Sequence, residues 1–93
     1  MKLKFDKYND QGTLFLEENG EQIAYMNLIF RPNNKMVIDE TQVMPDYEGQ
    51  GLGKLLVNAA ADLARKNNLR IFSVCPYAKS VFKKTDEYDD VLV

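Results

Sequence analysis

The chain contains no histidine and no tryptophan, and Cys75 is its only cysteine. Histidine titrates nearest to neutral pH and is the commonest metal ligand in proteins, so we expect neither a zinc site nor a nucleophile activated by an imidazole. One cysteine cannot form a disulfide within the chain, which fits a reducing compartment. The chemistry of an active site would therefore depend on carboxylates, tyrosines, backbone groups or this one thiol.

Long apolar runs and a surplus of basic charge are also missing. No apolar run approaches the length of a membrane span, and the alternating first residues do not resemble a secretion signal. The formal net charge of −2 argues against a clustered basic surface for nucleic acid. With 93 residues, of which 45% are hydrophobic, we expect one domain spanning residues 1–93. We expect it to be cytoplasmic by default and to bind neither nucleic acid nor membrane.

The first half of the chain has the pattern of antiparallel strands. Leu3 to Tyr8 alternates between apolar and polar residues, as a half-buried strand does. Thr13 to Glu17 is a second strand, and Asn19-Gly20 is a strong hairpin signal that joins it to Ile23 to Phe30. The apolar run of this third strand predicts cover on both of its faces.

The second half predicts a strand, a long helix and a parallel strand. Met36 to Val43 is the fourth strand, followed by Pro45, which has no N–H for sheet pairing. Apolar residues recur every three or four positions from Gly51 to Asn67, which predicts an amphipathic helix. Ile71 to Val74 is then a strand parallel to the fourth, and Ala78 to Lys84 is a short helix. The expected fold class is α/β (α+β) with a mixed sheet, and the apolar end of the chain, Val91 to Val93, is either a last edge strand or a docked terminus.

The turn between the fourth strand and the long helix carries glycines at alternate positions, Gly49, Gly51 and Gly53. Glycine permits backbone angles that other residues avoid, and it has no Cβ to keep a ligand away from the main chain. The helix that follows presents free N–H groups and the positive end of its dipole. An anionic ligand that carries phosphate is therefore the first functional hypothesis.

Spacing excludes two common phosphate-binding loops. A Walker loop has four residues between its first glycine and a Gly-Lys pair, followed by Ser or Thr. Here three residues separate Gly49 from Gly53, and Leu55 follows Lys54. A dinucleotide loop has the rhythm Gly-x-Gly-x-x-Gly early in a strand–helix–strand unit, and these glycines do not follow it.

The spacing does resemble the acyl-CoA signature of the GNAT N-acetyltransferase superfamily, Gln/Arg-x-x-Gly-x-Gly/Ala, which falls on Glu48 to Gly53. The chain looks most like the short, single-domain members, whose pattern here is Thr41-Gln42-Val43, the Gly-x-Gly turn, the helix and Cys75-Pro76-Tyr77. The resemblance implies acetyl-CoA as the cofactor. It also implies an amine acceptor, either a small molecule or a protein lysine.

The resemblance further implies where the cofactor lies. The pantetheine arm would follow the exit of the fourth strand, at Gln42, Val43 and Met44. The diphosphate would lie against the turn and the start of the helix, at Glu48, Gly49, Gln50, Gly51, Leu52, Gly53 and Lys54. Glu48 departs from the Arg or Gln of the signature, and Lys54 either adds a compensating cation or is a surface lysine.

Three side chains are candidates for the chemistry. Glu40 is the candidate general base, with Asp39 as the alternative, unless both are solvated strand residues. Cys75 either takes the acetyl group in a covalent intermediate or packs as a small hydrophobic residue. In this resemblance Phe82 stands where the superfamily has its proton-donating tyrosine, so Tyr77 replaces it as general acid, a water does, or CoA leaves as an unprotonated thiolate. The alternative for Tyr77 is an aromatic packed on the core.

Two other functions stay open beside the acetyltransferase. The first is a CoA-binding module with little or no catalysis. The second is an interaction domain in which the glycines only allow the helix to pack closely on the sheet. Full-length family members insert two helices between their first strands, where this chain has only Asn9 to Gly12. The acceptor site is therefore expected to be shallow, on a monomer, or shared in a weak homodimer.

Overall fold

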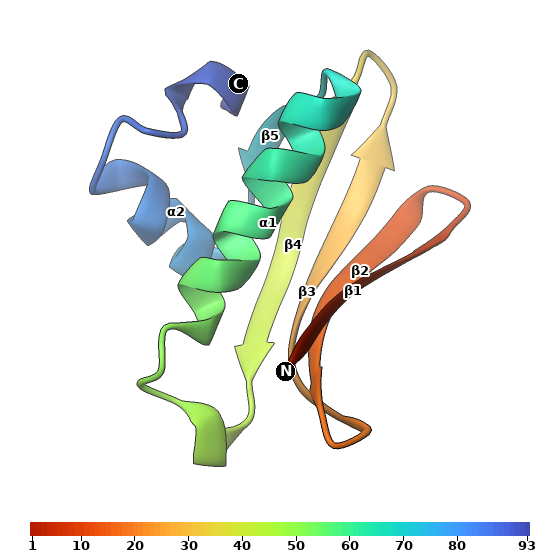
Figure 1. Ribbon diagram of the computed structural model, residues 1–93. Helices are drawn as coiled ribbons and strands as arrows, with labels where there is room; N and C mark the ends of the chain where they lie inside the picture. The colour runs from red at the N-terminus through yellow and green to blue at the C-terminus, as the bar shows by residue number, and fades with distance from the viewer.

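The computed structural model describes all residues from 1 to 93 and shows a five-stranded sheet with helices packed on it (Figure 1). The strands lie side by side in chain order and are β1 (Lys2–Tyr8), β2 (Gln11–Glu18), β3 (Glu21–Arg31), β4 (Lys35–Val43) and β5 (Arg70–Ser73). The first four are antiparallel, whereas β5 runs parallel to β4. The predicted fold class is confirmed.

Helix α1 (Leu52–Asn67) begins within one residue of its predicted start and packs on one face of the sheet, roughly along the direction of β4 (Figure 1). Its inward face is built from the residues that recur at helical spacing, namely Leu52, Leu56, Val57, Ala60, Ala61 and Ala64. The helix ends at Asn68, which is left-handed with φ 55° and whose N–H bonds to the carbonyls of Ala64 and Arg65. Arg65 and Lys66 lie in the last turn, where cations complement the negative end of the helix dipole.

The last third of the chain closes one edge of the sheet. Helix α2 (Pro76–Lys83) begins two residues earlier than predicted, because proline is favoured in the first turn, where its missing N–H has no helical partner. After a short 3-10 turn η2 (Asp89–Val91), Leu92 forms a parallel bridge to Ile71 of β5. The tail therefore docks along the outer edge of β5.

The core lies between α1 and one face of the sheet. Met26, Leu28, Met36 and Ile38 point toward the helix and are almost fully buried. On the other face of β3, Tyr25, Asn27 and Ile29 stay partly exposed, since no helix lies over them. The prediction that this strand is covered on both faces is therefore wrong. No helix in the structure combines the length and the apolar character that crossing a bilayer requires.

Candidate functional site

A β-bulge divides β4 into two halves. Two successive residues of β3 pair with Glu40 and Ile38, so Asp39 is an extra residue in β4. Strand β5 pairs with β4 only as far as Ile38, whose carbonyl accepts the N–H groups of Val74 and Cys75 at 3.0 and 3.2 Å. Beyond the bulge, β4 continues to Val43 with no partner strand on that side. The two parallel strands have diverged there.

The glycine turn follows directly after this free half of β4. The short 3-10 turn η1 (Pro45–Tyr47) leads to Gly49 and Gly51, which both adopt φ 78°. A Cβ built on either glycine would meet no atom within 4 Å. Glycine is therefore favoured at these two positions by the positive φ and not by close packing of the helix on the sheet. No side chain caps α1 at Gly51, so the N–H groups of its first turn have no side-chain partner.

A cavity of about 420 Å³ lies between the turn and the end of β4, and we call it the turn groove. It is lined by Thr41, Gln42, Val43, Tyr47, Glu48, Gly49, Gly51, Leu52, Gly53 and Tyr77. Most of the cofactor residues expected from the sequence thus meet in one place. Gln50 and Lys54 are exposed beside it without lining it, and Met44 lines a different cavity.

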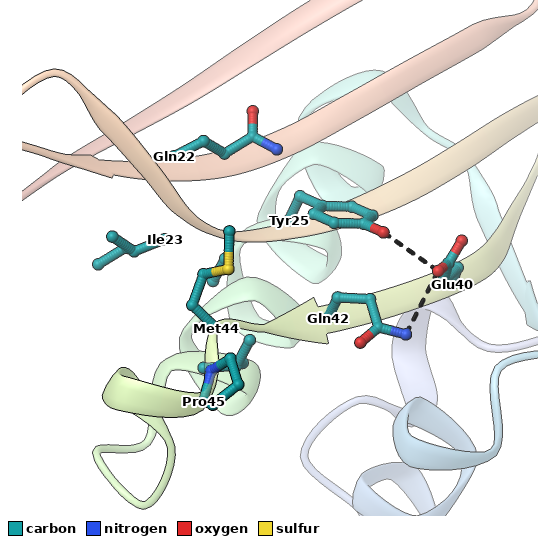
Figure 2. A pocket seen from close by; sticks show the side chains of 9 residues that line it. Gln22, Ile23, Tyr25, Glu40, Gln42, Met44 and Pro45 are labelled. Atoms are coloured by element: carbon teal, nitrogen blue, oxygen red, sulfur yellow. Dashed lines mark hydrogen bonds between the residues drawn. The ribbon is translucent and has the colours of Figure 1, made fainter.

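That second cavity measures about 300 Å³, and we call it the strand pocket. It is lined by Gln22, Ile23, Ala24, Tyr25, Glu40, Gln42, Val43, Met44 and Pro45. Figure 2 shows two side chains that converge on one carboxylate oxygen, Oε2 of Glu40. The Tyr25 hydroxyl donates to it at 3.1 Å and the Gln42 amide at 3.3 Å. Burial, with the hydrogen bond to this carboxylate as the second cause, raises the pKa of Tyr25, which keeps the phenol a neutral donor.

The structure separates Glu40 from Cys75. Successive strand residues point to opposite faces, so Thr41 lies on the helix side of β4 while Glu40 faces the strand pocket. The Cys75 thiol donates to the Thr41 hydroxyl, with 3.5 Å between sulfur and oxygen, and it is only 4% exposed. Asp39, the alternative base, is exposed and lines a separate, smaller cavity beside Thr13.

Tyr77, near the start of α2, forms one wall of the turn groove. A Cβ built on Gly53 would lie 2.8 Å from the tyrosine Cζ, so glycine is what lets this ring cross the start of α1. Burial first, and the electrostatic effect of the nearby Cys75 second, raise the pKa of Tyr77, so its hydroxyl keeps its proton. Phe82 packs edge-on against Tyr88 with 5.3 Å between ring centroids, so its ring contacts the core.

The turn groove and the strand pocket share two residues, Gln42 and Val43, at the end of β4. A molecule bound in either cavity would touch these two residues. The arrangement offers two compartments that meet at the end of one strand. The turn groove has main-chain N–H groups and two tyrosines, and the strand pocket has a carboxylate held by two donors.

Six lining residues were not foreseen as site residues from the sequence, namely Gln22, Ile23, Ala24, Tyr25, Pro45 and Tyr47. Tyr25 is the most informative of them, because it lies opposite Gln42 in the pairing of β3 with β4. The register of that pairing is the signal that would have identified it.

A family model described as GCN5-related N-acetyl-transferase matches residues 13–91. The chain belongs to this family. Among solved structures, a GCN5-like protein from Staphylococcus aureus, determined by NMR, is 35% identical with a TM-score of 0.72. The match covers 98% of this chain and 88% of that one. The chain is thus a short GNAT protein, and the resemblance inferred from its motifs is confirmed. A comparison with curated proteins finds no match.

More distant GNAT structures share the fold alone. The ribosomal-protein-S18-alanine N-acetyltransferase from Escherichia coli is 19% identical with a TM-score of 0.71, covering 84% of this chain and 53% of its own. GCN5 from Tetrahymena is 18% identical with a TM-score of 0.69, covering 83% of this chain and 51% of its own. A Brucella melitensis ribosomal-protein-alanine N-acetyltransferase is 16% identical, with a TM-score of 0.71, and covers 84% of this chain. This GNAT chain spans only 64% of that enzyme and about half of the other two.

Proposed function

We propose that the protein transfers an acetyl group from acetyl-CoA to an amine, with donor and acceptor approaching the end of β4 from opposite sides. The observation that carries this proposal is the shared wall of the two cavities. Gln42 and Val43 line both the turn groove and the strand pocket. Reactants bound in the two compartments would therefore meet beside these residues, and holding them together supplies much of the catalysis.

The turn groove is the proposed site of acetyl-CoA. Its diphosphate would bind the main-chain N–H groups at Gly51 and at the start of α1, where the helix dipole favours negative charge. The pantetheine arm would run along the free half of β4 and take the place of the absent strand partner. Glu48 also lines the groove, and Lys54 lies close enough in sequence to offset its charge.

The strand pocket is the proposed site of the amine. Glu40 would accept a proton from the amine, directly or through a water, while the nitrogen attacks the thioester carbonyl. The two hydrogen bonds that Glu40 accepts, from Tyr25 and Gln42, would hold the carboxylate in place. Apolar atoms of Met44 and Pro45 would contact the carbon chain of the acceptor.

The tetrahedral intermediate would collapse with cleavage of the C–S bond. Tyr77 lines the turn groove and carries a neutral hydroxyl, so it is the proposed donor of a proton to the departing CoA thiolate. Cys75 lies beneath Thr41 and does not line the groove itself. We therefore favour direct attack by the amine over an acetylated cysteine.

Two measurements test the proposal. Calorimetry with acetyl-CoA tests the turn groove, and absence of binding at millimolar ligand would overturn the proposal. CoA release in the presence of a panel of amines tests catalysis. A rate no faster than in buffer, with binding intact, would leave a CoA-binding module instead of an enzyme.

A matched pair of variants tests the base. Glu40→Gln should lower the rate about 10²- to 10⁴-fold, the usual range for loss of a general base, and leave the affinity for acetyl-CoA unchanged. Asp39→Asn removes the neighbouring carboxylate, which lies outside the strand pocket, and should keep the wild-type rate. Equal rates in the two variants would remove Glu40 from the mechanism.

A further inference from the structure

The two edges of the sheet differ in how the chain covers them. Along β5, the tail forms the bridge from Leu92 to Ile71, and the N–H of Val93 donates to the Ile71 carbonyl at 3.0 Å. At the opposite edge, β1 pairs with β2 alone over Lys2–Tyr8, and all of its residues are exposed. A free edge of this kind presents a row of unpaired N–H and C=O groups to a further strand.

An apolar stripe accompanies this free edge. Leu3 and Phe5 pair with Leu16 and Leu14 of β2, so all four side chains point to the helix side of the sheet. The β2 leucines are buried, but Leu3 is 49% exposed and Phe5 is 37% exposed. Figure 1 shows β1 on the side of the sheet away from β5 and the C-terminal tail, beyond the reach of α1. Phe30 covers Phe5 in part, with 6.3 Å between the ring centroids, but no helix covers this end of the core on β1.

We propose that β1 pairs antiparallel with β1 of a second copy of the chain, about a two-fold axis at Phe5. The charges along the strand support this register. It sets Lys4 opposite Asp6 of the second copy, and the symmetry repeats that pair, so two opposite-charge pairs form. Lys4 already binds Glu17 of β2 at 2.7 Å, so the signs would alternate across the joined sheet.

Neighbouring registers are less favourable. Moving the axis by one residue to Lys4 or to Asp6 places that charged residue against its own copy. The Lys4 register also pairs Lys2 with Asp6, but only the register centred on Phe5 forms opposite-charge pairs with no like-charge pair. Moving it by half a residue would set residues that point to opposite faces against each other, which antiparallel pairing does not allow. Like charges directly opposite each other destabilise a strand pair, so the sequence of β1 selects the register centred on Phe5. Lysines on an edge strand discourage pairing with other strands, but in this register the lysines of β1 do not oppose pairing with β1 of the second copy.

The resulting contact is small, because it joins two seven-residue strands and their side chains. Interfaces of that size belong to weak, transient complexes. The dimer should therefore form in the micromolar to millimolar range, and it leaves both the turn groove and the strand pocket free, since no β1 residue lines either. This separates it from the proposed acetyltransferase activity, which it neither requires nor alters.

Sedimentation velocity over that concentration range tests the proposal. The wild-type chain should pass from monomer to dimer as concentration rises. Asp6→Lys replaces both attractive pairs by repulsion and should raise the dissociation constant by about tenfold or more. Asp10→Lys makes the same charge change in the exposed turn after β1, and its dissociation constant should stay within about twofold of the wild-type value.

A charge reversal completes the test. The triple variant K4D/D6K/E17K inverts the charges at positions 4, 6 and 17 together, so each opposite-charge pair is kept with its signs exchanged. It should dimerise as the wild type does, whereas Asp6→Lys alone should dimerise more weakly. Thermal unfolding of each variant checks that the fold persists. A wild-type chain that stays monomeric throughout, a dimer that ignores Asp6→Lys, or a triple variant that stays monomeric while folded would overturn the proposal.

Discussion

The ring of Tyr77 lies directly across Gly53, where an added Cβ would stand 2.8 Å from the tyrosine Cζ and hydroxyl oxygen. The contact joins the starts of the two helices, since Gly53 is the second residue of α1 and Tyr77 the second of α2. It also shapes the turn groove, which both residues line. Gly53, which the sequence predicted to contact phosphate, thus also makes room for Tyr77, the side chain that forms one wall of the turn groove.

Gly53→Ala should disturb this contact in a way that depends on Tyr77. Crowding a packed site costs about 1–3 kcal/mol, whereas alanine is about 1 kcal/mol better than glycine in a helix. We therefore compare the effect of Gly53→Ala on the free energy of unfolding in two backgrounds. This effect should be about 1–3 kcal/mol more stabilising when Tyr77 is already replaced by alanine than when Tyr77 is present. Urea unfolding of the four proteins measures this coupling. Equal effects in both backgrounds would show that the alanine meets no resistance from the ring.

Gly51→Asp and Gly51→Asn form a matched pair at the N-cap of α1. Both side chains tolerate the left-handed angle at Gly51, and they differ in charge alone. The aspartate should weaken acetyl-CoA binding about tenfold or more relative to asparagine, because it sets a carboxylate against the diphosphate. The aspartate should also match or exceed the asparagine in melting temperature, since the helix dipole favours an anion there. Calorimetry and thermal unfolding check both points, and equal affinities would move the phosphates away from this turn.

Cys75→Ser tests whether the thiol takes part in acetyl transfer. The serine hydroxyl can still donate to Thr41, as the thiol does, so the fold should persist. If the amine attacks acetyl-CoA directly, the rate of CoA release changes no more than a few-fold. Mass spectrometry of the wild-type protein mixed with acetyl-CoA alone should then show no added acetyl group at the cysteine. A collapse of the rate with acetyl-CoA binding intact would instead support a covalent intermediate.

The docked tail should weaken in acid because of Asp90. Arg65 donates to both of its carboxylate oxygens, at 2.8 and 2.9 Å, and these hydrogen bonds are the main reason that the pKa of Asp90 lies below its ordinary value of 3.8. A carboxylate whose pKa is lowered by folding stabilises the protein when the pH is above the pKa of the unfolded chain. This stabilisation is lost as the pH falls through the lower pKa of the folded protein. The melting temperature of the wild type should exceed that of Asp90→Asn near neutral pH. The difference between the two melting temperatures should vanish below about pH 4.

Asp89→Asn is the control for this comparison. Asp89 is exposed and its side chain makes no such ion pair. Its melting temperature should follow that of the wild type at every pH. A gap between wild type and Asp90→Asn that stays constant down to pH 3 would contradict the role assigned to the ion pair.

Local patterns predicted the elements of this fold well. The apolar spacing of α1 was sufficient to place it within one residue, because a helix that packs on a sheet needs that stripe wherever the sheet lies. The Asn19-Gly20 hairpin is present with φ values of 53° and 80°, since few residue pairs tolerate those angles. The strand–helix–strand order required β5 to be parallel to β4, and it is. Each of these features depends on residues that are close together in the chain.

The sequence by itself thus determined the fold class, the family and the glycine turn, because periodicity, turn angles and short motifs are local. Only the tertiary structure decided that Asp39 is a bulge, that Tyr25 and Gln42 hold Glu40, and that Cys75 lies away from that carboxylate. The physical reason is strand register. Pairing β3 with β4 one residue differently would turn every side chain to the other face, and no local pattern specifies that choice.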